Sequence, residues 1–171
     1  INRSLPVQDM AVHLQANEYA ETMSCRHIME AILNTSIKNN PDLHDLIDYF
    51  EMSEHLGKKY KNLSGGQKQR FTLIMVLSQK AEMTFFDEVT SGLDFETRQK
   101  LVKKIQDWYQ DSQASYCVVS HYYEELEQLV DTILLLEKGH VVAYGKKQDL
   151  FNRYCGQQVI LIENTPANQA L

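Results

Sequence analysis

Cysteine, glycine and proline are scarce in this sequence. Its 171 residues include three cysteines, Cys25, Cys117 and Cys155, which are far apart and form no CxxC pair. An odd number of cysteines at such spacing predicts neither a disulfide framework nor a zinc site, and it suits a reducing compartment. Seven glycines and three prolines are too few for a long disordered tract.

Long apolar runs and a surplus of basic residues are also missing. No apolar run approaches the roughly 18 residues that a membrane span requires. The net charge is −6 and the one basic cluster lies at residues 58–61, so we expect no nucleic-acid partner. The start, INRSLPVQDM, lacks an initiating Met and the features of a signal peptide, and we expect it to begin partway through a longer chain. The remaining composition, 43% apolar and 23% charged, fits one domain with a core.

Helical patterns occupy residues 24–56. Ser24 is a candidate cap for a helix whose apolar face lies within residues 28–32. The pair Asn40-Pro41 is a typical N-cap and first-turn combination, and residues 43–50 continue it with an apolar stripe of helical period. These two segments predict a small helical unit.

Short buried strands alternate with helices in the second half of the chain. Residues 83–86 and 116–119 are apolar runs bounded by turn formers, which predicts strands. Helices are predicted within residues 71–77, 101–109 and 124–130, with Asp94 as a cap for the second of them. Two apolar runs around Lys138-Gly139 predict a hairpin. This order of elements predicts an α/β fold with a largely parallel sheet.

Two acidic residues and a histidine follow the predicted strands. Asp87 and Glu88 come directly after residues 83–86, and His121 follows residues 116–119. Ligands gather beyond the carboxyl ends of strands in open α/β sheets. There one carboxylate could hold Mg²⁺, the next could polarise a water, and the histidine could bind a phosphate oxygen. The alternative is a solvated turn of ordinary acids and a loop histidine with no role.

A glycine pair stands at a predicted helix start in residues 63–70, LSGGQKQR. Backbone amides at a helix N-terminus bind anions, glycines allow close approach, and the Ser64 hydroxyl adds a donor. The alternative is a glycine turn with Ser64 as an ordinary cap. No glycine-rich loop with a Lys, of the kind that cradles phosphates, occurs elsewhere in the chain.

Motifs in register over residues 5–150 resemble the second half of the ATP-binding cassette (ABC) family of transport ATPases. They are, in order, Gln8 within LPVQD, similar to the Q-loop glutamine; LSGGQKQR, similar to the signature motif; Phe85-Phe86-Asp87-Glu88, similar to the Walker B strand; Ser91-Gly92-Leu93-Asp94, similar to the D-loop; and His121, similar to the switch histidine. The hairpin ILLLEKGHVVAYG also resembles the C-terminal strands of the family.

The resemblance implies a P-loop NTPase-like three-layer α/β fold, incomplete, with a helical subdomain and a C-terminal β-hairpin. It divides the chain into a Q-loop region (1–13), a helical subdomain (14–62), the second half of a catalytic core (63–150) and a tail (151–171).

The resemblance also implies a site shared by two cassettes that pack head to tail around ATP. Ser64, Gly65, Gly66 and Gln67 are then expected to face the γ-phosphate of ATP held by the second cassette. Asp87 is expected to hold Mg²⁺, Glu88 to act as the general base, His121 to contact the γ-phosphate, Gln8 to sense Mg²⁺ or the water, and Asp94 to lie at the dimer interface. The helical subdomain is expected to dock onto a transmembrane permease at the cytoplasmic face of the cell membrane.

The sequence departs from the family pattern in what precedes Gln8. The Walker A loop, GxxGxGK[ST], and the aromatic residue that stacks on adenine lie upstream in the family and are not found here. We therefore expect a truncated chain that exposes strands 83–86 and 116–119, is poorly soluble and hydrolyses no ATP alone. Val89 stands where the family usually has Pro, and we expect a small effect on that turn.

Three functions are compatible with these motifs. The first is the energy-coupling ATPase subunit of a transporter, with export preferred because residues 154–162 resemble the tails of exporting cassettes. The second is a non-transport ABC ATPase, which the acidic charge and the lack of a long coiled coil disfavour. The third is a non-catalytic cassette that lends only its signature motif to a complete partner.

Overall fold

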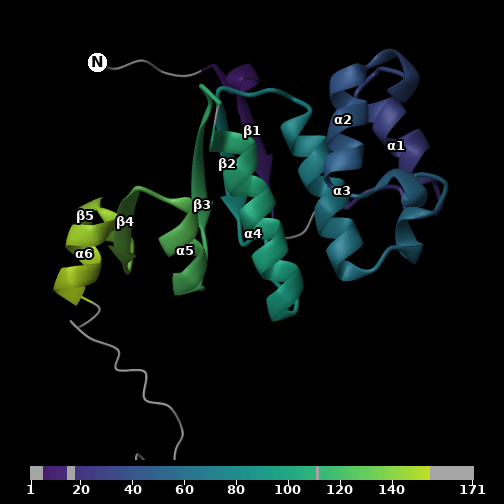
Figure 1. The fold of residues 1–171 in the computed structure, drawn as a ribbon. Helices are drawn as coiled ribbons and strands as arrows, with labels where there is room; N and C mark the ends of the chain where they lie inside the picture. Colours follow the sequence, from purple (N-terminus) through teal and green to yellow (C-terminus); the bar gives the residue numbers. More distant parts are fainter. Residues whose placement is uncertain (1–5, 15–17, 111, 155–171) are drawn as a thin grey trace, which may run out of the picture. The chain divides into compact units, whose positions relative to one another are not determined.

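A computed structural model of the chain describes residues 6–14, 18–110 and 112–154. Their contacts form two compact units, residues 1–129 and residues 130–171, and each unit is described by itself. The first unit contains a parallel sheet with its helices, and the second contains a hairpin and one helix (Figure 1). The α/β fold class is confirmed.

Three parallel strands form the sheet of the first unit, in the order β1-β2-β3. They are β1 (Met10–His13), β2 (Met83–Asp87) and β3 (Ser115–Val119). β2 and β3 confirm the two predicted strands. β1 was not predicted, because four residues are too short for a clear alternating pattern.

Five α-helices and four short 3₁₀ helices complete the described part of this unit. The α-helices are α1 (Cys25–Ile32), α2 (Pro41–Tyr49), α3 (Gly65–Leu77), α4 (Phe95–Gln110) and α5 (Tyr123–Leu129). The 3₁₀ helices are η1 (Val7–Asp9), η2 (Ile37–Asn39), η3 (Ser53–His55) and η4 (Tyr60–Asn62). The predicted caps are confirmed, since Ser24 accepts from the His27 amide and Asn40 accepts from the Leu43 amide.

The core of the first unit lies around α3, between the sheet and the helices α1 and α2. α3 contacts both β1 and α2, and Figure 1 shows it between the sheet and the pair α1 and α2. The predicted helix within residues 71–77 is confirmed. Every residue of α3 from Phe71 to Leu77 is buried, as expected for a helix segment that is apolar on nearly all sides. On the sheet itself, Phe86 of β2 is 1% exposed.

The two faces of the sheet are covered unequally in the described part of the chain. One face carries Phe86 and the buried Thr84, whose hydroxyl accepts a 2.8 Å hydrogen bond from Tyr109 of α4. On the other face, Val12 is 47% and Val119 is 52% exposed. The expected exposure is therefore found at β3. For β2 the expected exposure of the strand edges is wrong, because β1 and β3 pair with both of them.

The second unit is a two-stranded antiparallel hairpin with a helix packed against it. β4 (Thr132–Glu137) and β5 (His140–Lys146) pair as predicted, and α6 (Lys147–Tyr154) contacts both. Lys138 and Gly139 both have positive φ, 49° and 79°, which is typical of a tight hairpin turn. The predicted boundary at residue 150 falls inside α6. Among the helices that the structure describes, none is long and apolar enough to cross a membrane.

Candidate functional site

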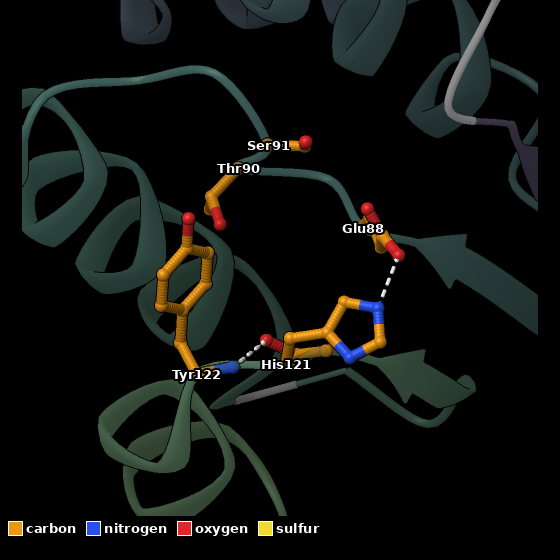
Figure 2. Close-up of a pocket in the computed structure, with 6 residues that line it drawn as sticks. Glu88, Thr90, Ser91, His121 and Tyr122 are labelled. Carbon is orange, nitrogen blue, oxygen red and sulfur yellow. Dashed lines mark hydrogen bonds and ion pairs between the residues drawn. The ribbon is translucent and has the colours of Figure 1, made fainter.

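A small pocket lies at the carboxyl ends of β2 and β3. Its volume is about 120 Å³, and it is lined by Glu88, Thr90, Ser91, Ser120, His121 and Tyr122. Figure 2 shows Glu88 and His121 facing each other on one side of the pocket, with Thr90 and Tyr122 on the other. The imidazole Nε2 of His121 lies 2.7 Å from Oε1 of Glu88. The structure thus brings together two residues that the sequence separates by 33 positions.

The backbone after β2 directs Glu88 into this pocket. Asp87 is the last residue of β2, and Glu88 has a positive φ of 46°, a conformation that costs energy for a residue with a side chain. The Glu88 amide donates a 2.9 Å hydrogen bond to the Val119 carbonyl, at the end of β3. The Ser91 amide in turn donates to the Glu88 carbonyl at 2.9 Å. Backbone hydrogen bonds therefore join the ends of β2 and β3 and the turn that follows β2.

The signature segment forms a capping box at the start of α3. The Gln67 amide donates to Ser64 Oγ at 3.3 Å, and the Ser64 amide donates to Gln67 Oε1 at 3.0 Å. The Gln67 side chain also hydrogen-bonds the His55 ring, with 3.0 Å between Nε2 and Nε2. Ser64 and Gln67 thus stabilise the helix start. The first amides of the helix, those of Gly65 and Gly66, remain at its anion-binding end.

The two glycines of the signature segment have different surroundings. A Cβ added at Gly65 would have no atom within 4 Å, whereas a Cβ at Gly66 would lie 3.3 Å from Thr97 Cγ2. Gly66 therefore allows the start of α3 to pack against the start of α4, and Gly65 leaves open space in front of the helix. Sequence reasoning assigned the same role to both glycines.

Asp94 caps α4 beside this contact. Its carboxylate accepts from the Thr97 amide at 3.0 Å and from the Thr97 hydroxyl at 2.7 Å. These hydrogen bonds hold the pKa of Asp94 below its usual value. The Thr97 amide has the larger effect and the Thr97 hydroxyl the next largest. The predicted cap is thus present, and it places the D-loop segment directly against the signature helix.

Gln8 is the one proposed site residue whose position contradicts its assignment. It lies in η1, before β1, and β1 runs parallel to β2 with Met10 beside Met83 and His13 beside Phe86. Asp87 follows Phe86, so Gln8 and Asp87 belong to opposite ends of the sheet, about 13 Å or more apart at a rise of about 3.3 Å per residue. The Gln8 side chain lies outside what the structure describes, but no side chain bridges that distance. The prediction that Gln8 senses Mg²⁺ is wrong.

Asp87 fits a magnesium ion that is held mainly by phosphate oxygens. In the described residues, no group of three or more His, Cys, Asp or Glu side chains could hold a metal ion. Mg²⁺ is commonly bound by one or two carboxylates together with substrate phosphates. A single carboxylate at the end of β2, beside the Glu88 pocket, is sufficient for that arrangement.

Comparisons with known proteins agree with this geometry. The profile of the ABC transporter family matches residues 3–91, slightly more than half of the chain. A solved metal-chelate type ABC transporter in an inward-facing conformation is similar in fold, with a TM-score of 0.71 at 17% sequence identity over 82% of this chain and 59% of that one.

Three curated relatives illustrate the sequence similarity. A linearmycin resistance ATP-binding protein of Bacillus subtilis is 29% identical over 126 residues, 74% of this chain and 40% of that protein. An energy-coupling factor transporter ATP-binding protein of Mycoplasmopsis synoviae is 37% identical over 60% of this chain and 38% of that protein. A methionine import ATP-binding protein of Clostridium tetani is 36% identical over 64% of this chain and 35% of that protein.

The chain thus spans 35–40% of the length of these curated relatives. The family match covers the signature segment and the Walker B strand, and the fold likeness extends the agreement to most of the chain. The chain belongs to the ABC transporter family.

Proposed function

We propose that the protein containing this chain hydrolyses ATP to drive transport. The observation that carries the proposal is the contact of 2.7 Å between Glu88 and His121, in a pocket at the carboxyl edge of a parallel sheet. A carboxylate and an imidazole in contact at such an edge are suited to activating a water beside a phosphate. The signature helix supplies a second, separate group of phosphate-binding amides.

Glu88 is the general base in this proposal. Its carboxylate takes a proton from a water molecule while the water oxygen attacks the γ-phosphorus and the bond to the β-phosphate oxygen breaks, yielding ADP and phosphate. His121 is 78% exposed at its side chain and can turn from Glu88 to hydrogen-bond a γ-phosphate oxygen. Asp87 would hold Mg²⁺, which neutralises charge on the phosphates when bound.

The signature segment acts on a second nucleotide. Gly65 and Gly66 amides and the Ser64 hydroxyl would face the γ-phosphate of ATP held by a second cassette, and the open space at Gly65 supports that approach. Gln67 acts through the capping box that positions these donors. Asp94, beside this helix, would lie at the interface between the two cassettes.

Gln15 replaces Gln8 in the role of the Q-loop glutamine. It follows His13, the last residue of β1, by two positions in the sequence, and β1 ends beside Phe86 at the edge where Asp87 lies. Substituting Gln15 by Ala should lower ATP hydrolysis, while Gln8→Ala should leave it unchanged. Unchanged hydrolysis in Gln15→Ala would exclude Gln15 from this role.

A transmembrane permease is the proposed partner, which places the protein at the cytoplasmic face of a membrane. The preference for export has no support, because the named relatives include a resistance protein as well as an import protein and an energy-coupling factor protein. We propose transport coupling without a direction.

The test is phosphate release by the full-length protein, with and without Glu88→Gln. We expect hydrolysis that requires Mg²⁺ and is lost in the variant while ATP binding remains. A non-catalytic cassette would show the opposite pattern: no loss with Glu88→Gln, and loss with Gly65→Ala only after mixing with a complete partner cassette. That outcome would overturn the proposal.

A further inference from the structure

A buried carboxylate lies beside the Glu88–His121 pocket without lining it. Glu125 of α5 is 1% exposed. A buried carboxylate is costly unless donors satisfy its oxygens, and an apolar residue of similar volume would often serve the fold equally well. The contacts of Glu125 therefore indicate what it does.

Each oxygen of Glu125 accepts from a different loop of the pocket. The Thr90 hydroxyl donates to Oε1, and the Ser120 hydroxyl donates to Oε2 at 2.6 Å. Thr90 belongs to the turn that begins with Glu88, and Ser120 directly precedes His121. Both Thr90 and Ser120 line the pocket. One buried side chain thus joins the segment that carries the base to the segment that carries the histidine.

Arg98 of α4 places a positive charge near Glu125. Its Nε lies 4.0 Å from Oε1 of Glu125, and its guanidinium lies over the Tyr122 ring at 3.6 Å from the centroid. The same guanidinium donates to the Leu93 carbonyl at 3.4 Å. Arg98 is thereby held from three directions, and its charge compensates the buried carboxylate.

The loops that Glu125 joins contain features that need such support. Glu88 has a strained positive φ of 46°, and such conformations persist only where the surroundings impose them. Ser120 Oγ accepts a 3.0 Å hydrogen bond from the Tyr122 amide, visible in Figure 2, so its position also determines the turn around His121. Moving either hydroxyl would alter the separation of Glu88 and His121.

We propose that Glu125 is a positioning residue for hydrolysis, which holds Thr90 and Ser120 together and thereby keeps Glu88 and His121 opposed across the pocket. This inference rests on the proposed ATP hydrolysis for its kinetic consequence. Its structural consequence, the order of the two loops, can be measured without nucleotide.

The kinetic experiment compares Glu125→Gln and Glu125→Ala with Glu124→Gln in the full-length protein. Glu124 is an exposed neighbour on the same helix, so its substitution makes the same chemical change outside the network. We expect kcat to fall about 10-fold in Glu125→Gln and about 100-fold in Glu125→Ala, because misplacement of about 1 Å has effects of that size. KM for ATP should stay within about twofold of the original value, because the signature amides and Asp87, which bind the phosphates and Mg²⁺, are untouched.

The second experiment measures amide hydrogen exchange in the absence of ATP. The amides of Glu88, Ser91 and Tyr122 should exchange at least about tenfold faster in Glu125→Gln, while amides inside α3 keep their rates. Thr90→Val, which removes one donor, should reproduce the effect, and Thr90→Ser, which keeps the hydroxyl, should not. If Glu125→Ala does not fold, Thr90→Val and Thr90→Ser still test the positioning role.

The outcomes separate this inference from the proposed function. A protein that hydrolyses ATP through Glu88 but keeps its kcat in Glu125→Gln and Thr90→Val overturns the positioning role alone. Uniformly faster exchange throughout residues 6–129 also overturns it, because that pattern reflects lost stability. A protein that hydrolyses no ATP refutes the proposed function, and the exchange of the three amides still decides the inference.

Discussion

The signature segment and the strand-end pocket are constructed in different ways. At the signature segment, the hydrogen bonds join residues three positions apart, Ser64 and Gln67, within one turn of α3. At the pocket, Glu88 meets His121 and Thr90 meets Glu125, which lies 35 positions away in the sequence. A site of local contacts tolerates changes elsewhere in the fold, whereas a site of long-range contacts depends on the packing of several elements.

The largest expected effect separates chemistry from folding at the pocket. Glu88→Gln keeps the shape of the side chain but removes the proton acceptor, and we expect ATP hydrolysis to fall about 10²–10⁴-fold. Nucleotide binding and thermal unfolding should remain close to those of the original protein. Phosphate release, binding titration and calorimetry on the same preparation measure all three. Turnover within a few-fold of the original would remove Glu88 from its assigned role.

The next comparison uses the two signature glycines. Gly65→Ala should lower hydrolysis about 100-fold, because a methyl group then stands where a phosphate must approach. It should leave the melting temperature unchanged or raised, because Ala favours a helix over Gly. Hydrolysis and thermal unfolding of the same variant test this, and a lower melting temperature would contradict it.

Gly66→Ala should instead destabilise the fold by about 1 kcal/mol, through crowding against Thr97. Thr97→Ser removes the crowded methyl and keeps the hydroxyl that bonds Asp94. The double variant Gly66→Ala with Thr97→Ser should therefore recover the denaturation midpoint that Gly66→Ala loses. Failure to recover would mean that the cost arises elsewhere.

A smaller effect is expected from the helix cap itself. Ser64→Ala removes the acceptor for the Gln67 amide and should lower the free energy of unfolding by about 1 kcal/mol. Ser64→Asp keeps an acceptor and should retain the stability, while its charge repels phosphate and lowers hydrolysis. If both variants lose equal stability, the capping box is not the source of the effect.

The smallest expected effect is a pH dependence from Asp94. Its pKa in the folded protein is below the usual value because Thr97 donates to the carboxylate. The charged form is thus favoured by folding, so this stabilisation is complete above the unfolded pKa of about 3.9 and is lost as pH falls through the folded pKa. Urea midpoints of the original protein and Asp94→Asn, measured from about pH 5 to pH 2, should converge at the acid end. If the urea midpoints of the two proteins change in parallel with pH, Asp94 is not the source of the pH dependence.

Sequence-based predictions were correct where the structure depends only on residues close together in the chain. Ser24, Asn40 and Asp94 were identified as caps because each cap acts within one helical turn, and the structure contains all three. The prediction for Gln8 was wrong, because the sheet edge that a residue occupies depends on where the neighbouring strand begins and ends. Once β1 is paired with β2, the assignment can be decided from the register alone.

The residues that hydrogen-bond beside the pocket could not be identified from the sequence, because their contacts also depend on the tertiary structure. Thr90, Ser120 and Glu125 are common polar residues in ordinary positions, and nothing in their spacing distinguishes them. Only the packing of α5 against α4 and the two strand ends gives Glu125 its burial and its partners.

The sequence by itself determined the family, most of the helices and strands in their order, and the presence of acidic, histidine and glycine motifs. Those features follow from local periodicity, capping and motif spacing, which involve residues close together in the chain. The tertiary structure decided which groups meet: Glu88 with His121, Gly66 with Thr97, and Glu125 with both loops of the pocket. Such contacts depend on strand register and helix packing, which arise from the whole unit and are not encoded in any one segment.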